Sequence, residues 1–226
     1  MSRSRWISAL RTAVLCAVGG VLASAAPAGC AAGASSDAAM AGQPQRWRSA
    51  DGRVSLLRPA AAKLSTQDVP VGSLMTSGWR LIWDGTAPTP GTLEVRLALA
   101  VIAPPPQTRK TEYLQIGMSR DPVSVRTCLS GGLQGGSARR LPDRIIHGQR
   151  YTVWTHTDSG MSQTIDARDL RTVHDGACYA LERFSYADSA SDPDASVSLS
   201  ERRGAAALDA ALASVTLARP RTGARR

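Results

Sequence analysis

The sequence has 226 residues, of which 43% are hydrophobic, 20% are charged and only 4% are aromatic. This apolar fraction excludes a wholly disordered chain, and the length suits one globular domain. The formal net charge is +9, but many of the basic residues lie near the two ends of the chain. We therefore expect no nucleic-acid partner, because binding to a phosphate backbone needs a basic face on the folded body.

Residues 1–29 have the pattern of a secretory signal. Arg3, Arg5 and Arg11 form a positively charged start, and residues 12–26 form an apolar stretch that ends in small residues. The apolar stretch is too short and too often interrupted by glycine for a transmembrane helix. We therefore predict export from the cytoplasm.

The end of the signal resembles a bacterial lipobox, in which a cysteine becomes the lipidated first residue of the mature chain. Ala28 and Gly29 before Cys30 fit that pattern, whereas Pro27 stands where an aliphatic residue is usual. An ordinary cleavage site at residues 26–28 is the alternative. We predict lipidation at Cys30, which would anchor the protein to a membrane.

The predicted anchor sets the domain organisation. Residues 30–45 are small and flexible and are expected to form a linker, residues 46–218 a single domain, and residues 219–226 a basic tail. The resemblance to lipoproteins implies an outer-membrane location facing the periplasm, because Ala31 is not a retention signal. A soluble periplasmic or secreted protein is the alternative.

Two of the four cysteines lie in the N-terminal segment and two lie in the body of the chain. Cys16 lies in the signal and Cys30 at the anchor site, which leaves Cys128 and Cys178 in the body of an exported chain. An oxidising compartment favours a disulfide between them, and the chain-entropy model gives it about 4 kcal/mol of stabilisation. A catalytic cysteine with a histidine such as His174 as its base is the alternative.

Strands and turns dominate the body. Leucine and valine alternate with polar or small residues over 92–102, which predicts a half-buried strand. Aspartate or histidine before glycine tolerates the positive φ of two-residue hairpin turns. Four such turns are predicted, at Asp51-Gly52, Asp84-Gly85, His147-Gly148 and Asp175-Gly176.

Two helices complete the predicted fold. Asp121 followed by Pro122 predicts the N-cap and first residue of a short helix. A second helix is expected from Ser198 to about Ser214, followed by a last strand over 215–217. This order predicts an α+β fold, with an antiparallel sheet of about seven strands and one short and one C-terminal helix packed on one side.

The densest polar stretch runs from residue 156 to residue 178. Histidine and carboxylate side chains could hold a metal ion if three or four converged, but no histidine spacing typical of a zinc site is present. We therefore predict no metal and no cofactor. The polar residues in question are His156, Asp158, Asp166, Asp169, His174 and Asp175.

Two glutamates and the tryptophans are further candidates. Cleavage of a glycosidic bond uses a pair of carboxylates, one of which has its pKa raised by an apolar setting. Glu94 and Glu182 lie in predicted strands, and we expect their carboxylates to form salt bridges or to face solvent rather than to form such a pair. For Trp79 and Trp83 we expect core positions, with one exposed ring as the alternative.

Three segments near the C-terminus, residues 160–163, 171–182 and 208–215, resemble a motif of uncharacterised exported proteins of Gram-negative bacteria. The second segment contains Cys178 and reads RTVHDGACYALE. The resemblance covers the last third of the chain. It implies a domain family of the cell envelope, and it brings no activity, substrate or catalytic residue.

The sequence therefore favours a non-catalytic, lipid-anchored envelope protein that binds or assembles with an envelope protein or glycan. One alternative is an envelope hydrolase acting on wall or glycan, with His156, His174 or Glu182 as acid or base. Another is a secreted inhibitor of a foreign enzyme, presented on residues 131–140. An enzyme should show a pocket with converging titratable groups, and a binding module should show an exposed apolar patch.

Overall fold

The computed structural model describes residues 42–67, 75–76, 78–83, 89–101, 109–130, 138–160, 163–188 and 199–219. All of them belong to one compact unit, Ser35–Arg226. The signal, Cys30, the turn at Asp84-Gly85 and the helix start at Ser198 lie outside the described residues. Among the residues that are described, no helix is long and apolar enough to cross a membrane.

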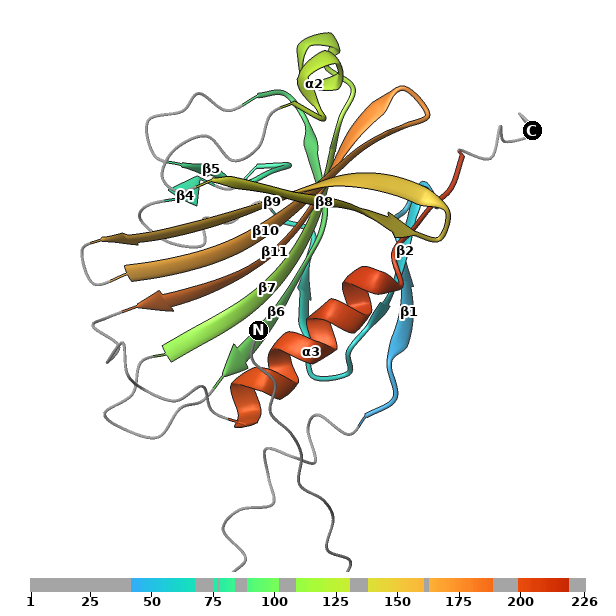
Figure 1. The fold of residues 1–226 in the computed structure, drawn as a ribbon. Coiled ribbons are helices and arrows are strands. Elements are labelled where there is room, and N and C mark those ends of the chain that lie inside the picture. Colours follow the sequence, from blue (N-terminus) through green and yellow to red (C-terminus); the bar gives the residue numbers. More distant parts are fainter. Residues whose placement is uncertain are drawn as a thin grey trace, which may run out of the picture. The chain divides into compact units, whose positions relative to one another are not determined.

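Seven antiparallel strands form the main sheet (Figure 1), which confirms the predicted α+β class and the expected antiparallel sheet. Every neighbouring pair is antiparallel, and four of the strands are more than ten residues long. In spatial order the strands are β3 (Lys63–Ser65), β6 (Thr92–Val101), β7 (Arg109–Ser119), β11 (Ala177–Asp188), β10 (Gln163–His174), β9 (Gln149–Gly160) and β8 (Arg139–Ile146).

The predicted turns explain two of the hairpins in this sheet. His147 and Gly148 join β8 to β9 with φ values of 46° and 79°, and Asp175 and Gly176 join β10 to β11 with φ values of 49° and 67°. Two successive residues with positive φ match the twist of antiparallel strands, so the strands pair directly through a two-residue turn. Both predicted hairpins are confirmed.

Smaller elements flank the main sheet. The predicted turn at Asp51-Gly52 lies between β1 (Gln45–Arg48) and β2 (Val54–Arg58), but the connection is longer than two residues, spans 49–53 and has a positive φ at Gly52 only. The last strand β12 (Thr216–Leu217) pairs with the other edge of β2. A further short pair consists of β4 (Met75–Thr76) and β5 (Ile82–Trp83). The helices are α2 (Pro122–Thr127) and α3 (Leu199–Ala213).

The larger core lies on the face of the main sheet that carries Tyr179 and Leu181, which we call the helix face. Helix α3 and strand β2 cover this face (Figure 1). Leu208 and Leu212 of α3, four residues apart and so on one face of the helix, are completely buried there. Burying such leucines stabilises the fold by about 1.5–3 kcal/mol each, which explains why this helix tolerates an internal glycine.

The opposite face carries Cys178, Ala180 and Glu182, and residues 78–81 cross it, so we call it the segment face. Because side chains alternate along a strand, the residues of β11 divide strictly between the two faces. Val125 of α2 and the adjoining Cys128 pack against Cys178 and Ala180 on the segment face. The prediction of two helices on one side therefore needs a refinement, since α3 and α2 contact opposite faces.

Candidate functional site

A row of polar side chains crosses the segment face from one strand to the next. Strand register places Arg96 of β6 opposite Gln115 of β7, Gln115 opposite Glu182 of β11, and Glu182 opposite Asp169 of β10. All four residues are buried. The alternating pattern of β6 predicted a half-buried strand, but both of its faces are buried around Arg96.

Ion pairs and hydrogen bonds connect this row. The completely buried Arg171 places Nε 2.6 Å from Oδ1 of Asp169 and Nη2 3.3 Å from Oε1 of Glu182. Nε of Arg96 donates to the side-chain oxygen of Gln115 at 2.8 Å. Buried charges are tolerated only when they are paired in this way, so each member of the row depends on its neighbours.

The row also holds residues 78–81 on the sheet. The backbone N–H of Leu81 donates to both carboxylate oxygens of Glu182 at 2.8 Å, and the side-chain amide of Gln115 donates to the carbonyl of Gly78 at 3.2 Å. A Cβ at Gly117 would overlap the carbonyl of Trp79. The Trp79 ring itself is buried, as expected for a core tryptophan.

Burial and, after it, the neighbouring carboxylate of Asp169 raise the pKa of Glu182, Arg171 opposes them, and the resulting pKa is about 8. A carboxylate pair with one raised pKa is the arrangement that acid catalysis uses. Here, however, the carboxylate of Glu182 is enclosed under Leu81 and anchors its backbone. Glu94, the other strand glutamate, accepts a hydrogen bond from the hydroxyl of Thr92 instead.

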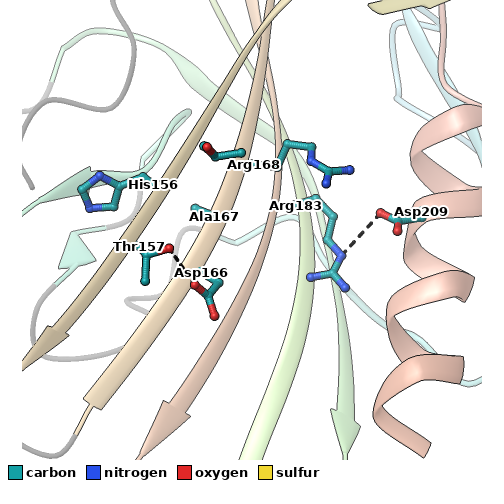
Figure 2. Close-up of a pocket in the computed structure, with 8 residues that line it drawn as sticks. His156, Thr157, Asp166, Ala167, Arg168, Arg183 and Asp209 are labelled. Atoms are coloured by element: carbon teal, nitrogen blue, oxygen red, sulfur yellow. Dashed lines mark hydrogen bonds and ion pairs between the residues drawn. The ribbon is translucent and has the colours of Figure 1, made fainter. Parts of the chain in front are cut away.

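A cavity of about 260 Å³ opens on the helix face beside α3 (Figure 2). Arg183 lies at its edge and forms ion pairs with Glu112 at 2.5 Å and with Asp209 of α3 at 3.7 Å. Titratable groups of both signs therefore meet in an accessible hollow. The side chains of this face that line it are Thr155, Thr157, Asp166, Arg168, Arg183 and Asp209.

Of the two histidines that the sequence singled out, His156 contributes to the lining of this cavity, but its side chain lies on the opposite face of the sheet, and His174 is not part of the lining. His156 is buried, and its ring points away from Arg168 and Arg183 (Figure 2). Burial lowers its pKa, and Asp158 opposes that shift. His174 instead contacts Gln149 through Nδ1 at 3.2 Å.

The carboxylates of the same stretch are also separated. Asp166 lies on the helix face, Asp169 on the segment face, and Asp175 in the turn, where it pairs with Arg120 at 3.7 Å. Within the described part of the chain, no group of three or more His, Cys, Asp or Glu side chains is placed to hold a metal ion.

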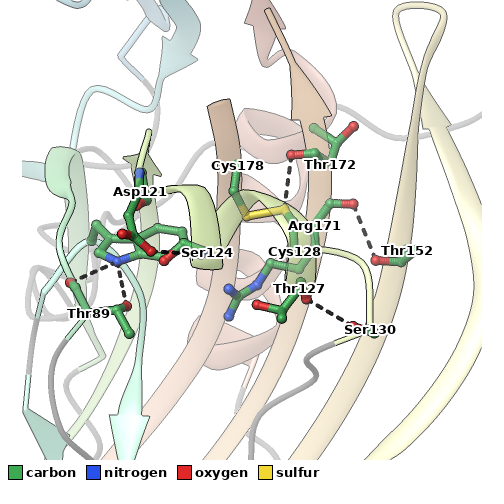
Figure 3. The surroundings of a disulfide bond; sticks show 12 residues. Thr89, Asp121, Ser124, Thr127, Cys128, Ser130, Thr152, Arg171, Thr172 and Cys178 are labelled. Atoms are coloured by element: carbon green, nitrogen blue, oxygen red, sulfur yellow. Dashed lines mark hydrogen bonds between the residues drawn. A yellow bond between two sulfur atoms is a disulfide. The ribbon is translucent and has the colours of Figure 1, made fainter. Parts of the chain in front are cut away.

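The disulfide joins α2 to the main sheet (Figure 3). The Sγ atoms of Cys128 and Cys178 lie 2.02 Å apart, as the sequence predicts, so neither sulfur is the free thiolate that a cysteine nucleophile requires. The carboxylate of Asp121 accepts from the N–H of Ser124 at 2.8 Å, which confirms the predicted N-cap. Both contacts fix α2 at one end of the sheet.

Exposed aliphatic side chains surround this end. Val123 within α2 and Leu129 just after it are 55% and 46% exposed. Val173, opposite Cys178, is 37% exposed, and Ile145 in the β8–β9 hairpin is 69% exposed. We call these four residues the aliphatic end. The sequence does not predict it, because single aliphatic residues at strand ends and in a short helix carry no periodic signal. Of residues 131–140, proposed as an inhibitory loop, 131–137 lie outside the described residues.

Comparison with known proteins does not indicate a function. No protein-family model matches the sequence, and no curated protein is significantly similar to it. The resemblance to exported proteins of Gram-negative bacteria therefore stays a prediction. The function has to be argued from the surfaces described above.

Proposed function

We propose that this chain is a non-catalytic, lipid-anchored protein of the cell envelope that binds another envelope component through its aliphatic end. The observation that carries the proposal is the exposure of Val123, Leu129, Ile145 and Val173 at one end of the sheet. Solvent-exposed aliphatic side chains that gather at one place mark interaction sites more often than isolated ones do.

The aliphatic end is built rigidly. The disulfide between Cys128 and Cys178 and the N-cap of Asp121 hold α2, while the β10–β11 turn holds Val173. A preorganised surface loses little conformational entropy when it binds, which favours affinity. Exposed Arg126 lies beside it on α2, so the apolar centre has a polar margin, as protein interfaces do.

The location follows from the N-terminal sequence. The signal over residues 1–29, Cys30 and the small residues of 30–45 support an exported domain tethered to a membrane, on the outer membrane facing the periplasm. The proposed partners are therefore the membrane, through the lipid, and an envelope protein or glycan at the aliphatic end. No nucleic acid is expected, because the positive charge does not form one face.

Photocrosslinking in the native envelope tests this function. Benzoylphenylalanine at position 129 should give one discrete adduct, and the second substitution Ile145→Asp should abolish it. The matched control is benzoylphenylalanine at Leu57, an exposed leucine on β2, which should give no such adduct. Equal labelling from both positions, or an adduct that survives Ile145→Asp, would contradict the proposal.

The envelope hydrolase stays a second candidate on one observation, the contact between Asp169, Arg171 and Glu182 with a raised pKa at Glu182. If Glu182 were an acid catalyst, the wild-type protein would release soluble sugars from purified cell wall and Glu182→Gln would not. We expect no release from either protein, because Leu81 covers the carboxylate.

A further inference from the structure

We propose that the cavity beside α3 binds a small zwitterion of dipeptide size, with its carboxylate at Arg168 and its ammonium group at Asp166. This site lies on the helix face, whereas the aliphatic end adjoins the segment face. The inference therefore goes beyond the proposed function and does not depend on it.

The positive side of the cavity is Arg168. Its register neighbours are Thr155 on β9 and Arg183 on β11. The charge of Arg183 is compensated by Glu112 and Asp209, but within the described part of the chain Arg168 forms no ion pair. An exposed guanidinium beside a threonine hydroxyl is a suitable donor set for a carboxylate.

The negative side is Asp166, two residues earlier on the same face of β10. Its Oδ1 accepts from the hydroxyl of Thr157 at 2.8 Å, and the side chain is exposed toward the cavity (Figure 2). Across the cavity, the side chain of Asp209 is 48% exposed, and among the described residues its one ion pair is the long contact to Arg183 at 3.7 Å. Two carboxylates with free acceptor positions suit an ammonium group, which has three donors.

The distance between Arg168 and Asp166 along β10 can be compared with the length of the ligand. Residues two apart on a strand are separated by about 6.6–6.8 Å along it. In an extended dipeptide the two Cα atoms are about 3.8 Å apart and each charged group adds one bond, so its ends are separated by about 6–7 Å. In a single amino acid the ammonium nitrogen and the carboxylate carbon are only about 2.5 Å apart, so a dipeptide matches this spacing better, and the cavity of about 260 Å³ has room for it.

Isothermal titration of the full chain with alanyl-alanine tests the proposal. The comparison ligands are N-acetyl-alanyl-alanine, which lacks the ammonium group, and alanyl-alanine amide, which lacks the carboxylate. The variants are Arg168→Gln and Asp166→Asn, both at exposed positions, with Arg48→Gln on β1 as an exposed arginine control. Ile145→Asp serves as a control for the aliphatic end.

We expect alanyl-alanine to bind with a Kd below about 1 mM and both blocked ligands to bind at least about tenfold more weakly. Arg168→Gln and Asp166→Asn should each weaken binding by a similar factor, and Arg48→Gln and Ile145→Asp should leave it unchanged. The proposal is overturned if alanyl-alanine does not bind at about 10 mM, if the acetylated ligand binds equally well, or if Arg168→Gln binds like the wild type. None of these results bears on crosslinking at Leu129, so the two proposals fail separately.

Discussion

Strand β10 carries two pairs of charged residues, one on each face of the main sheet. Arg171 and Asp169 lie on the segment face, completely enclosed and paired, whereas Arg168 and Asp166 are exposed on the helix face. All four belong to one strand, β10, and are separated by only a few residues. The first set pairs with Glu182, which holds Leu81 on the sheet, and the second lines an open cavity.

This difference shows that burial, and not residue type, decides what a charge does here. An enclosed arginine that contacts two carboxylates cannot exchange partners without exposing charge to an apolar interior. An exposed arginine beside a hydroxyl costs little to leave unpaired and can accept a ligand. The four predictions below test this division, beginning with the largest effect.

Replacing Arg171 should break the enclosed set. Arg171→Met leaves the carboxylate of Asp169 buried without its cation, next to Glu182, which should lower the free energy of unfolding by about 3–5 kcal/mol. The matched change Arg168→Met on the open face should cost less than about 0.5 kcal/mol. Urea denaturation of both variants measures the difference, and equal losses would show that the two sets are not distinct.

Removing the disulfide should release α2 from the segment face. The double change Cys128→Ser and Cys178→Ser should lower the free energy of unfolding by about 4 kcal/mol at most, because it frees the chain between them in the unfolded state. Non-reducing urea denaturation measures the loss, with reduced wild-type protein as the control. A loss below about 1 kcal/mol would mean that packing alone fixes α2.

Adding a methyl group at Gly117 tests whether residues 78–81 lie closely on the sheet. The new Cβ would overlap the carbonyl of Trp79, so Gly117→Ala should cost about 1–3 kcal/mol through displacement of this segment. The tryptophan fluorescence should also change as Trp79 moves. Wild-type stability in Gly117→Ala would contradict the close contact.

The last prediction concerns the pH dependence of stability. Burial and Asp169 raise the pKa of Glu182 from 4.5 to about 8, so between these values the folded state holds a proton that the unfolded state has lost. Stability from this group is therefore fully present below about pH 4.5 and is lost as the pH rises through about 8. Glu182→Gln should flatten this decline in urea midpoints, and an unchanged slope would contradict the assignment.

Local sequence patterns predicted the turns and the helix ends of the fold well. The glycine turns at Gly148 and Gly176 and the N-cap at Asp121 depend on backbone conformations that only a few residue types allow, so a single residue pair identifies them. The same holds for the buried face of α3, where the spacing of Leu208 and Leu212 is set by the helical period. In these places the local chemistry and the tertiary structure agree.

The enclosed charge row could not be predicted in this way. A polar residue such as Arg96 between apolar neighbours has the same pattern whether its face meets water or another segment, and only the tertiary structure brings it next to Gln115. Strand β7 was missed for a related reason, because its Gln115 and Glu112 are buried on opposite faces and remove the simple alternation. The cavity likewise depends on Arg168 and Asp209, which are distant in the sequence.

The intact mass of the protein, extracted from its own envelope and alkylated without reduction, tests most directly whether this is an anchored envelope protein. We predict a chain that begins at Cys30, carries acyl groups and contains no thiol that reacts, because Cys128 and Cys178 form the disulfide. A chain that begins elsewhere without acyl groups, or one in which Cys178 is alkylated, would contradict the account.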